Sequence, residues 1–168
     1  AAVLAELDTN TDGNLDEGEL ATAPGLNFGA RFIDTNKDQL ISREELIERF
    51  ELYREMRLAV TNKELVLVYN RRGVPGANVR LEPEFFLAEA LEPATDTTTR
   101  DGNFFPQAEG IELPGMRVGY YRVVVDSPHV EIPAAYASAD TTPLGVEVSP
   151  VAVDPSTYGQ IYLTIKDD

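Results

Sequence analysis

The chain lacks cysteine and tryptophan, and His129 is the only histidine among its 168 residues. Without cysteine it has no disulfide, no thiolate nucleophile and no zinc site built on cysteine. A serine triad would have to rely on His129, and no G-x-S-x-G motif is present. Acids abound for a glycoside-hydrolase pair, but there is no tryptophan to stack on a sugar ring. These absences predict a protein that is not an enzyme.

Long apolar runs and basic residues are also scarce. No apolar run approaches the roughly 18 residues that a membrane-spanning helix needs. The 29 Asp and Glu residues outnumber the 14 Lys and Arg residues, which gives a formal net charge of −15 at pH 7. Such a chain is unsuited to binding nucleic acid or an anionic membrane surface, because both repel it. Cations are its natural partners.

The chain divides into two parts that differ in composition and in the spacing of apolar residues. Residues 1–60 are rich in Leu, Ala and Glu, with apolar spacings of three and four that predict short helices. From Glu64 onward, short runs of Val, Tyr, Thr and Phe are separated by Gly and Pro, which predicts strands. All 11 prolines except Pro24 lie in this second part. We predict an α+β protein in which a helical part, 1–60, packs against a β-sandwich, 61–168.

One acidic pattern occurs twice, as DTNTDGNLDEGE (8–19) and as DTNKDQLISREE (34–45). A twelve-residue calcium loop takes oxygen ligands from positions 1, 3, 5, 7, 9 and 12, and the seventh is a backbone carbonyl. At these positions the first segment offers Asp8, Asn10, Asp12, the carbonyl of Asn14, Asp16 and Glu19, and the second offers Asp34, Asn36, Asp38, the carbonyl of Leu40, Ser42 and Glu45. The pattern predicts two Ca²⁺ sites.

This repeat resembles the EF-hand family over residues 1 to about 50. Gly13 occupies the sixth position of the first loop, where the backbone turns with positive φ. Gln39 replaces that glycine in the second loop, at a cost of order 1 kcal/mol, which predicts a weaker second site. Leu15 and Ile41 occupy the eighth positions, where a short β-bridge would join the two loops.

The last helix of the first part is predicted to be the longest, from 43 to about 60. It carries two apolar stripes at helical spacing. The stripes are Leu46, Phe50 and Tyr53, and Leu52, Met56 and Ala59. We expect one stripe to close the core of the helical part and the other to contact the sandwich. The alternative is a single broad core face.

Short alternating runs predict an antiparallel β-sandwich after residue 61. Strands are expected at 64–70, 77–86, 119–128, 144–150 and 158–166, and a hairpin at 95–105 with Asp101-Gly102 as its turn. On the first strand, Val66 and Val68 are expected to face the core. The runs GVPGANVRLEP, TRDGNFF and PGMRVGYYRVVV resemble the transthyretin-like or carboxypeptidase-regulatory-like domains of secreted bacterial proteins. The resemblance implies a prealbumin-like sandwich and a non-catalytic accessory or cell-surface module.

These features predict a calcium-binding, non-catalytic structural or interaction module. Calcium sensors open a Met-rich groove, and the chain has only two Met, which favours a structural module over a sensor. A sensor that exposes an apolar surface is the first alternative. A hydrolase that uses the sandwich is the second, although related enzymes need several histidines. The sequence does not indicate an oligomeric state. Exposed calcium loops suit millimolar calcium, so we expect an extracellular, periplasmic or cell-surface location and a protein partner there.

Overall fold

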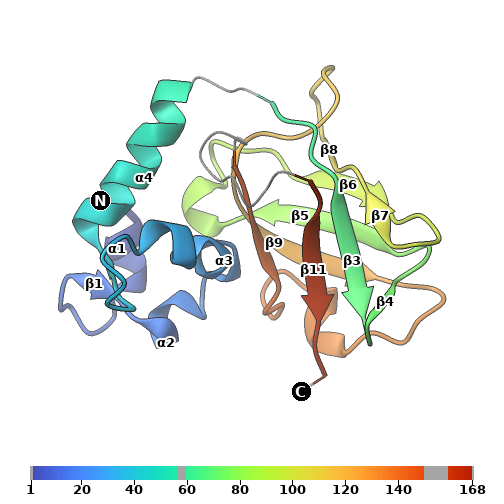
Figure 1. Cartoon of the computed structure of the whole chain (residues 1–168), viewed down its shortest axis with the longest axis horizontal. Coiled ribbons are helices and arrows are strands. Elements are labelled where there is room, and N and C mark those ends of the chain that lie inside the picture. Colours follow the sequence, from blue (N-terminus) through green and yellow to red (C-terminus); the bar gives the residue numbers. More distant parts are fainter. Residues whose placement is uncertain (1, 57–59, 150–158, 168) are drawn as a thin grey trace.

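A computed structural model describes the chain except for residues 1, 57–59, 150–158 and 168. A group of helices lies beside two β-sheets (Figure 1), which confirms the α+β class. The elements of the helical part are α1 (Ala2–Leu7), β1 (Asn14–Leu15), α2 (Glu17–Leu20), α3 (Pro24–Ile33), β2 (Ile41–Ser42) and α4 (Arg43–Met56). No helix in the described residues is both long enough and apolar enough to cross a membrane.

The described strands from β3 to β11 form two sheets around one apolar core. One sheet has the order β10-β9-β5-β6-β8, and the other has the order β11-β3-β4, with β7 also pairing with β3. Their bounds are β3 Leu65–Tyr69, β4 Arg72–Gly73, β5 Asn78–Pro83, β6 Ala94–Thr97, β7 Asn103–Phe104, β8 Gln107–Ala108, β9 Gly119–Asp126, β10 Gly145–Val148 and β11 Ile161–Ile165, with short 3-10 helices η1 (Phe85–Leu87) and η2 (Ala134–Ala137).

The topology differs from the predicted sandwich in two ways. β11 pairs in parallel with β3, so the smaller sheet is not purely antiparallel. The predicted turn forms, since the Gly102 amide donates to the Thr99 carbonyl (3.0 Å), but its two arms enter different sheets. β6 pairs with β5 and β8, whereas β7 pairs with β3. The segment 95–105 is therefore a corner between the sheets and not a hairpin.

The first strand of the sandwich also faces the opposite way from the prediction. Leu65 and Leu67 are fully buried in the sandwich core, and Val68 is only half-buried. Val66 is buried but lies outside that core. Every residue of this strand except the last is aliphatic, so its composition alone does not tell the two faces apart.

Helix α4 contacts the sandwich through its first stripe. The prediction that one stripe closes the helical core and the other contacts the sandwich is therefore wrong. Phe50 and Tyr53 pack against Tyr120 of β9, with ring centroids 5.9 and 6.2 Å apart. Leu52, from the second stripe, is exposed. Ala59 lies outside the described residues, as does the end of the predicted helix. The contacting face is therefore the one that also closes the helical core.

Helix α3 lies close against β9 and β10, and glycines make this approach possible. A Cβ atom on Gly145 would lie 2.1 Å from the carbonyl carbon of Pro24, and one on Gly25 would lie 2.7 Å from the Tyr121 amide nitrogen. One on Gly29 would lie 2.8 Å from the Glu147 carboxylate. The helix can therefore pack on the sheet almost backbone to backbone.

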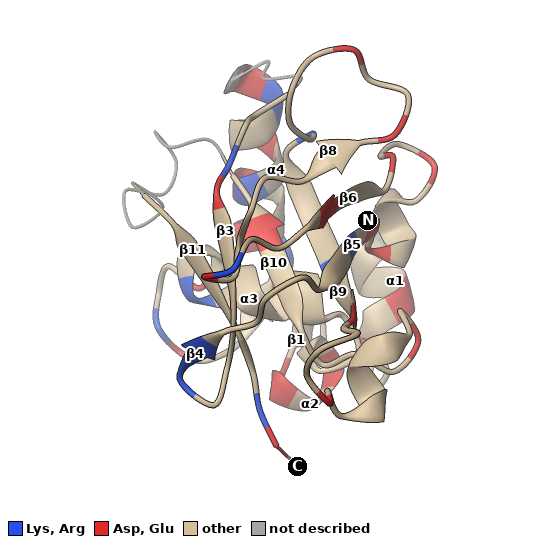
Figure 2. Ribbon diagram, turned by 90° about the vertical axis from the view of Figure 1, so that its right-hand side faces the viewer, with Lys and Arg blue, Asp and Glu red and all other residues tan. Residues whose placement is uncertain are grey.

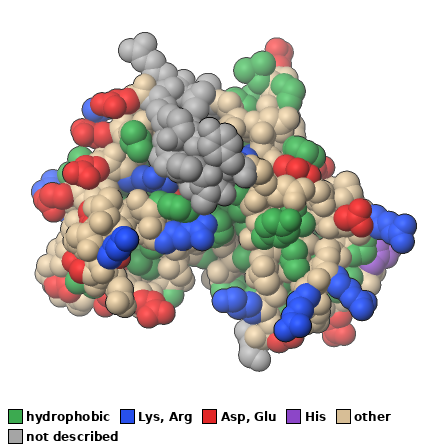
Figure 3. Space-filling model, in the orientation of Figure 1, with side chains coloured by type: hydrophobic (Ala, Val, Ile, Leu, Met, Phe, Trp, Pro, Cys, Tyr) green, Lys and Arg blue, Asp and Glu red, His purple; other side chains and the backbone are tan. Residues whose placement is uncertain are grey.

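Charge is distributed unevenly over the molecule. Acidic residues mark α1 and the loops near it, whereas β4 is basic (Figure 2). On the face seen in Figure 3, basic side chains gather along the lower edge of the sandwich. Arg71 and Arg72 at the β3–β4 turn and Lys166 after β11 are all exposed. In these views the acidic loops belong to the helical part and the basic edge belongs to the sandwich.

Candidate metal centre

The two acidic loops lie side by side because β1 and β2 pair. Leu15 lies opposite Ile41, and both side chains are buried in the helical core. Asn14 lies opposite Ser42 in the same antiparallel ladder. The predicted β-bridge at the eighth loop positions is confirmed. It fixes the relative position of the two loops.

The backbone of the two loops follows the same course. The fourth and sixth positions have positive φ in both, at 60° and 90° for Thr11 and Gly13 and at 63° and 70° for Lys37 and Gln39. Gln39 therefore adopts the left-handed geometry that glycine adopts without strain. The second loop keeps the turn of the first in spite of this replacement.

The first-position aspartates cap the turn of each loop from inside. Asp8 accepts from the Asp12 amide at 3.2 Å and from the Gly13 amide at 3.0 Å. The equivalent bonds to Asp34, from the amides of the fifth and sixth positions, have the same lengths. The third-position side chains of Asn10 and Asn36 each accept from the fifth-position amide at 2.8 Å. The fifth-position Asp12 and Asp38 each accept from the seventh-position amide at 2.9 Å.

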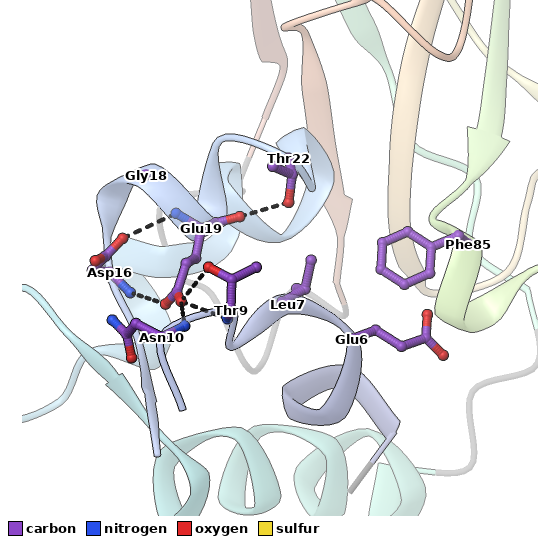
Figure 4. Close-up of a pocket in the computed structure, with 9 residues that line it drawn as sticks. All are labelled: Glu6, Leu7, Thr9, Asn10, Asp16, Gly18, Glu19, Thr22 and Phe85. Atoms are coloured by element: carbon purple, nitrogen blue, oxygen red, sulfur yellow. Dashed lines mark hydrogen bonds between the residues drawn. The ribbon is translucent and has the colours of Figure 1, made fainter. Parts of the chain in front are cut away.

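The twelfth-position glutamates reach back across their loops. Glu19 accepts from the amides of Thr9 (2.7 Å), Asn10 (3.2 Å) and Asp16 (3.1 Å), as Figure 4 shows. Glu45 accepts from the equivalent amides of the second, third and ninth positions at 2.9, 3.4 and 2.9 Å. Both glutamates are 6% exposed. Each therefore joins the start of its loop to the start of the helix that follows.

Hydrogen bonds keep both glutamates ionised. The Asp16 amide, with those of Asn10 and Thr9, lowers the pKa of Glu19 against the effect of burial. Burial raises the pKa of Glu45, but bonds from the Ser42 amide and hydroxyl and from two further amides lower it to about 2. Metal ligands have to be deprotonated, and both carboxylates meet that requirement at neutral pH.

The donor set of both loops consists of oxygen atoms, which is the set that calcium prefers. Within the described ranges, no three His, Cys, Asp or Glu side chains gather as a group able to hold a metal ion. Carboxylates alone therefore do not form a cage here, and a cation site in either loop would need asparagine and backbone carbonyl oxygens to complete its ligand set. The set fits a hard cation in its chemistry.

Two features of the site were not predicted from the sequence. Thr9 and Thr35, at the second loop positions, donate through amide and hydroxyl to Glu19 and Glu45. The shared D-T-N opening of both segments was the available signal for them. Phe85 of the sandwich is the other, since it stands across a cleft of about 600 Å³ beside the first loop (Figure 4). The cleft is lined by Glu6, Leu7, Thr9, Asn10, Asp16, Gly18, Glu19, Thr22 and Phe85.

The fold and site define an α+β protein with two equivalent acidic loops against a β-sandwich. Comparisons with protein-family models, with curated proteins and with solved structures find no significant match. The resemblances to the EF-hand and transthyretin-like families, and the division at residue 61, therefore stay predictions.

Proposed function

We propose that this chain is a non-catalytic calcium-binding module that holds two Ca²⁺, one in loop 8–19 and one in loop 34–45. The observation that supports this most is the common hydrogen-bond pattern of the two loops at positions 1, 3, 5 and 12. Seven of the twelve positions carry different residues in the two loops. The shared pattern therefore depends on the five identical residues, four of which are predicted ligands.

The charge of the loops supports the same proposal. Seven ligand carboxylates are held within two adjoining loops, and without a counterion they repel one another. They are Asp8, Asp12, Asp16 and Glu19 in the first loop and Asp34, Asp38 and Glu45 in the second. A bound divalent cation would remove this repulsion and favour the folded state. The first loop has one more carboxylate, so we expect it to bind more tightly.

Packing favours a structural role for the calcium over a sensor role. A sensor opens its helix pairs to expose an apolar groove. Here Phe50 and Tyr53 of α4 are already packed on Tyr120 of the sandwich, so opening would have to break that contact. We therefore expect no calcium-dependent increase in the fluorescence of a hydrophobic dye, and a large increase would favour the sensor instead.

Calorimetric titration tests the proposal directly. Wild type should bind two Ca²⁺ and bind Mg²⁺ much more weakly, and Glu19→Gln and Glu45→Gln should each lose one site. Glu17→Gln and Glu44→Gln are matched controls, because these exposed acids are near the ligands but outside the ligand positions. The controls should retain both sites. A wild-type isotherm without calcium binding would contradict the proposal.

We also propose an extracellular, periplasmic or cell-surface location, with a protein partner at that surface. Loops exposed to solvent, with one turn strained at Gln39, suit the weak affinities of modules that work in millimolar calcium. Fractionation of cells that make the native protein is the test. Recovery of the protein from the cytosol would count against this location.

A further inference from the structure

We propose that the sandwich positions the final glutamate of each calcium loop, through two Glu–Arg contacts just beyond the loops, in each of which the glutamate is buried. Affinity for calcium would then depend on contact with the five-stranded sheet. This inference rests on the proposed calcium binding and adds positioning residues that lie outside both loops.

The first contact is made by Glu84 and Arg122. The Glu84 side chain is fully buried, and its two oxygens accept from Arg122 Nε (2.8 Å) and from the Gly25 amide (2.7 Å). Arg122 also donates to the Thr22 carbonyl at 2.8 Å. The Thr22 hydroxyl in turn donates to the Glu19 carbonyl at 2.7 Å. This contact therefore fixes Thr22 and Gly25, which follow the last predicted ligand of the first loop.

The second contact is made by Glu147 of β10 and Arg49 of α4. Arg49 Nε and Nη2 both lie 2.9 Å from the same Glu147 oxygen, and the two side chains are 7% and 1% exposed. The Tyr53 hydroxyl donates to that oxygen as well. Arg49 lies four residues after Glu45, which places both on one face of the helix. This contact therefore grips α4 one turn beyond the last ligand of the second loop.

The two contacts are equivalent in position although they use different elements. In the first, Arg122 binds Thr22, three residues after Glu19, and Glu84 binds Gly25, six residues after it. In the second, Glu147 binds Arg49, four residues after Glu45. The orientation of that chain sets where the ligand carboxylate points. If the contact is lost, only a fraction of molecules holds the carboxylate in place, and the apparent affinity falls to that fraction of its original value.

Stability alone is a weaker explanation for the two contacts. A buried ion pair adds little net stability compared with apolar side chains of similar size, because both charges lose their hydration. Both pairs lie where they reach the residues that follow the ligands. Couplings between sites are usually about 5- to 150-fold, so we expect each contact to change the affinity of its own loop about tenfold.

The test compares the arginines of the two contacts, whose side chains are 7% and 17% exposed, with two more exposed arginines. Arg49→Gln is matched by Arg54→Gln on the same helix, where Arg54 is exposed and pairs with Glu51. Arg122→Gln is matched by Arg80→Gln on the same sheet, where Arg80 pairs with Glu82 and Glu109. Each substitution is made in the full chain, and calcium affinity is measured by calorimetry.

Single-loop backgrounds assign the effect to a loop. In Glu19→Gln, which leaves the second site, Arg49→Gln should weaken calcium binding about tenfold, and Arg54→Gln by less than about twofold. In Glu45→Gln, Arg122→Gln should weaken the first site about tenfold, and Arg80→Gln should again have little effect. Calcium affinities that are equal for Arg49→Gln and Arg54→Gln, and for Arg122→Gln and Arg80→Gln, would overturn the positioning role. Calcium binding itself would still stand. A wild type that binds no calcium would overturn the proposed function, and this inference with it.

A second measurement covers the case in which a buried variant does not fold. Coupling is reciprocal, so calcium should also strengthen the hold of the sheet on the helices. In wild type, calcium should slow amide hydrogen exchange in β10 (Gly145–Val148) about fivefold or more. Strand β6 (Ala94–Thr97), in the same sheet but away from both contacts, is the control and should be slowed less than β10, only as far as calcium stabilises the whole fold. Slowing of β10 no greater than that of β6 would overturn the inference.

Discussion

Tyr120 and Tyr121 are neighbours on β9, both are fully buried, and they belong to different cores. Tyr121 packs inside the sandwich, whereas Tyr120 packs among Phe50, Tyr53 and Phe86 in the helical core. Burial raises the pKa of both hydroxyls above the usual value for tyrosine. The core of the helical part is therefore completed by a side chain of the sandwich.

Removal of the Tyr120 ring should destabilise the protein strongly. Tyr120→Ala should lower the free energy of unfolding by about 3 kcal/mol or more, because it leaves a cavity in the helical core. Tyr162→Ala is the control, since Tyr162 is 60% exposed, and should change the free energy by less than about 0.5 kcal/mol. Urea unfolding followed by far-UV circular dichroism measures both. Similar values for the two variants would mean that Tyr120 does not support the helical core.

Calcium removal should act on the whole molecule. Tyr120 of the sandwich packs in the helical core, and two Glu–Arg contacts join the helices to the sandwich. It is therefore costly for the helices to unfold alone, and we expect a single thermal transition. At a hundredfold excess over Kd, each site contributes about 2.7 kcal/mol, which EDTA would remove. The midpoint should therefore drop in EDTA with helical and β signals lost together. Separate transitions for the two signals would refute this coupling.

The residue at the sixth loop position should affect the calcium affinity of each loop. Gln39→Gly relieves left-handed strain of about 1 kcal/mol, which is worth roughly a fivefold gain in affinity at the second loop. Gly13→Gln should weaken the first loop by a similar factor. Gln39→Ala is the control, because alanine keeps the strain. Calorimetry with calcium measures all three, and a Gln39→Gly variant no tighter than Gln39→Ala would contradict the expectation.

A methyl group at Gly145 should push α3 off the sheet. Its Cβ would overlap the backbone at Pro24, and overpacking of this kind typically destabilises by about 1 to 3 kcal/mol. Gly110→Ala tests backbone strain alone, because Gly110 has positive φ but no atom within 4 Å of an added Cβ. Chemical unfolding should show the larger loss for Gly145→Ala. A loss no larger than that of Gly110→Ala would argue against close packing of α3.

Local signals in the sequence predicted the bridge between the two acidic loops, whereas pairings between distant segments could not be predicted from the sequence. The ligand spacing and the bridge between Leu15 and Ile41 depend on a few neighbouring residues. The turn at Gly102 is equally local, but the sheets that its arms enter are decided by partners elsewhere in the chain. The contact of Arg49 with Glu147 joins distant segments, and neither residue has a neighbour that reveals it. Arg49 follows Glu48 and precedes Phe50, and neither neighbour indicates its partner.

The parallel pairing of β3 with β11 has a consequence for the order in which the chain folds during synthesis. β3 leaves the ribosome long before β11, so the smaller sheet lacks one of its strands until Ile161–Ile165 has been made. The two acidic loops emerge earlier still, but the ring of Tyr120 that completes the helical core follows only after several strands of the sandwich. Contacts between such distant segments form slowly. The helical part is thus made before the segments that complete its core, and during that interval its acidic loops lack the packing that the ring of Tyr120 provides.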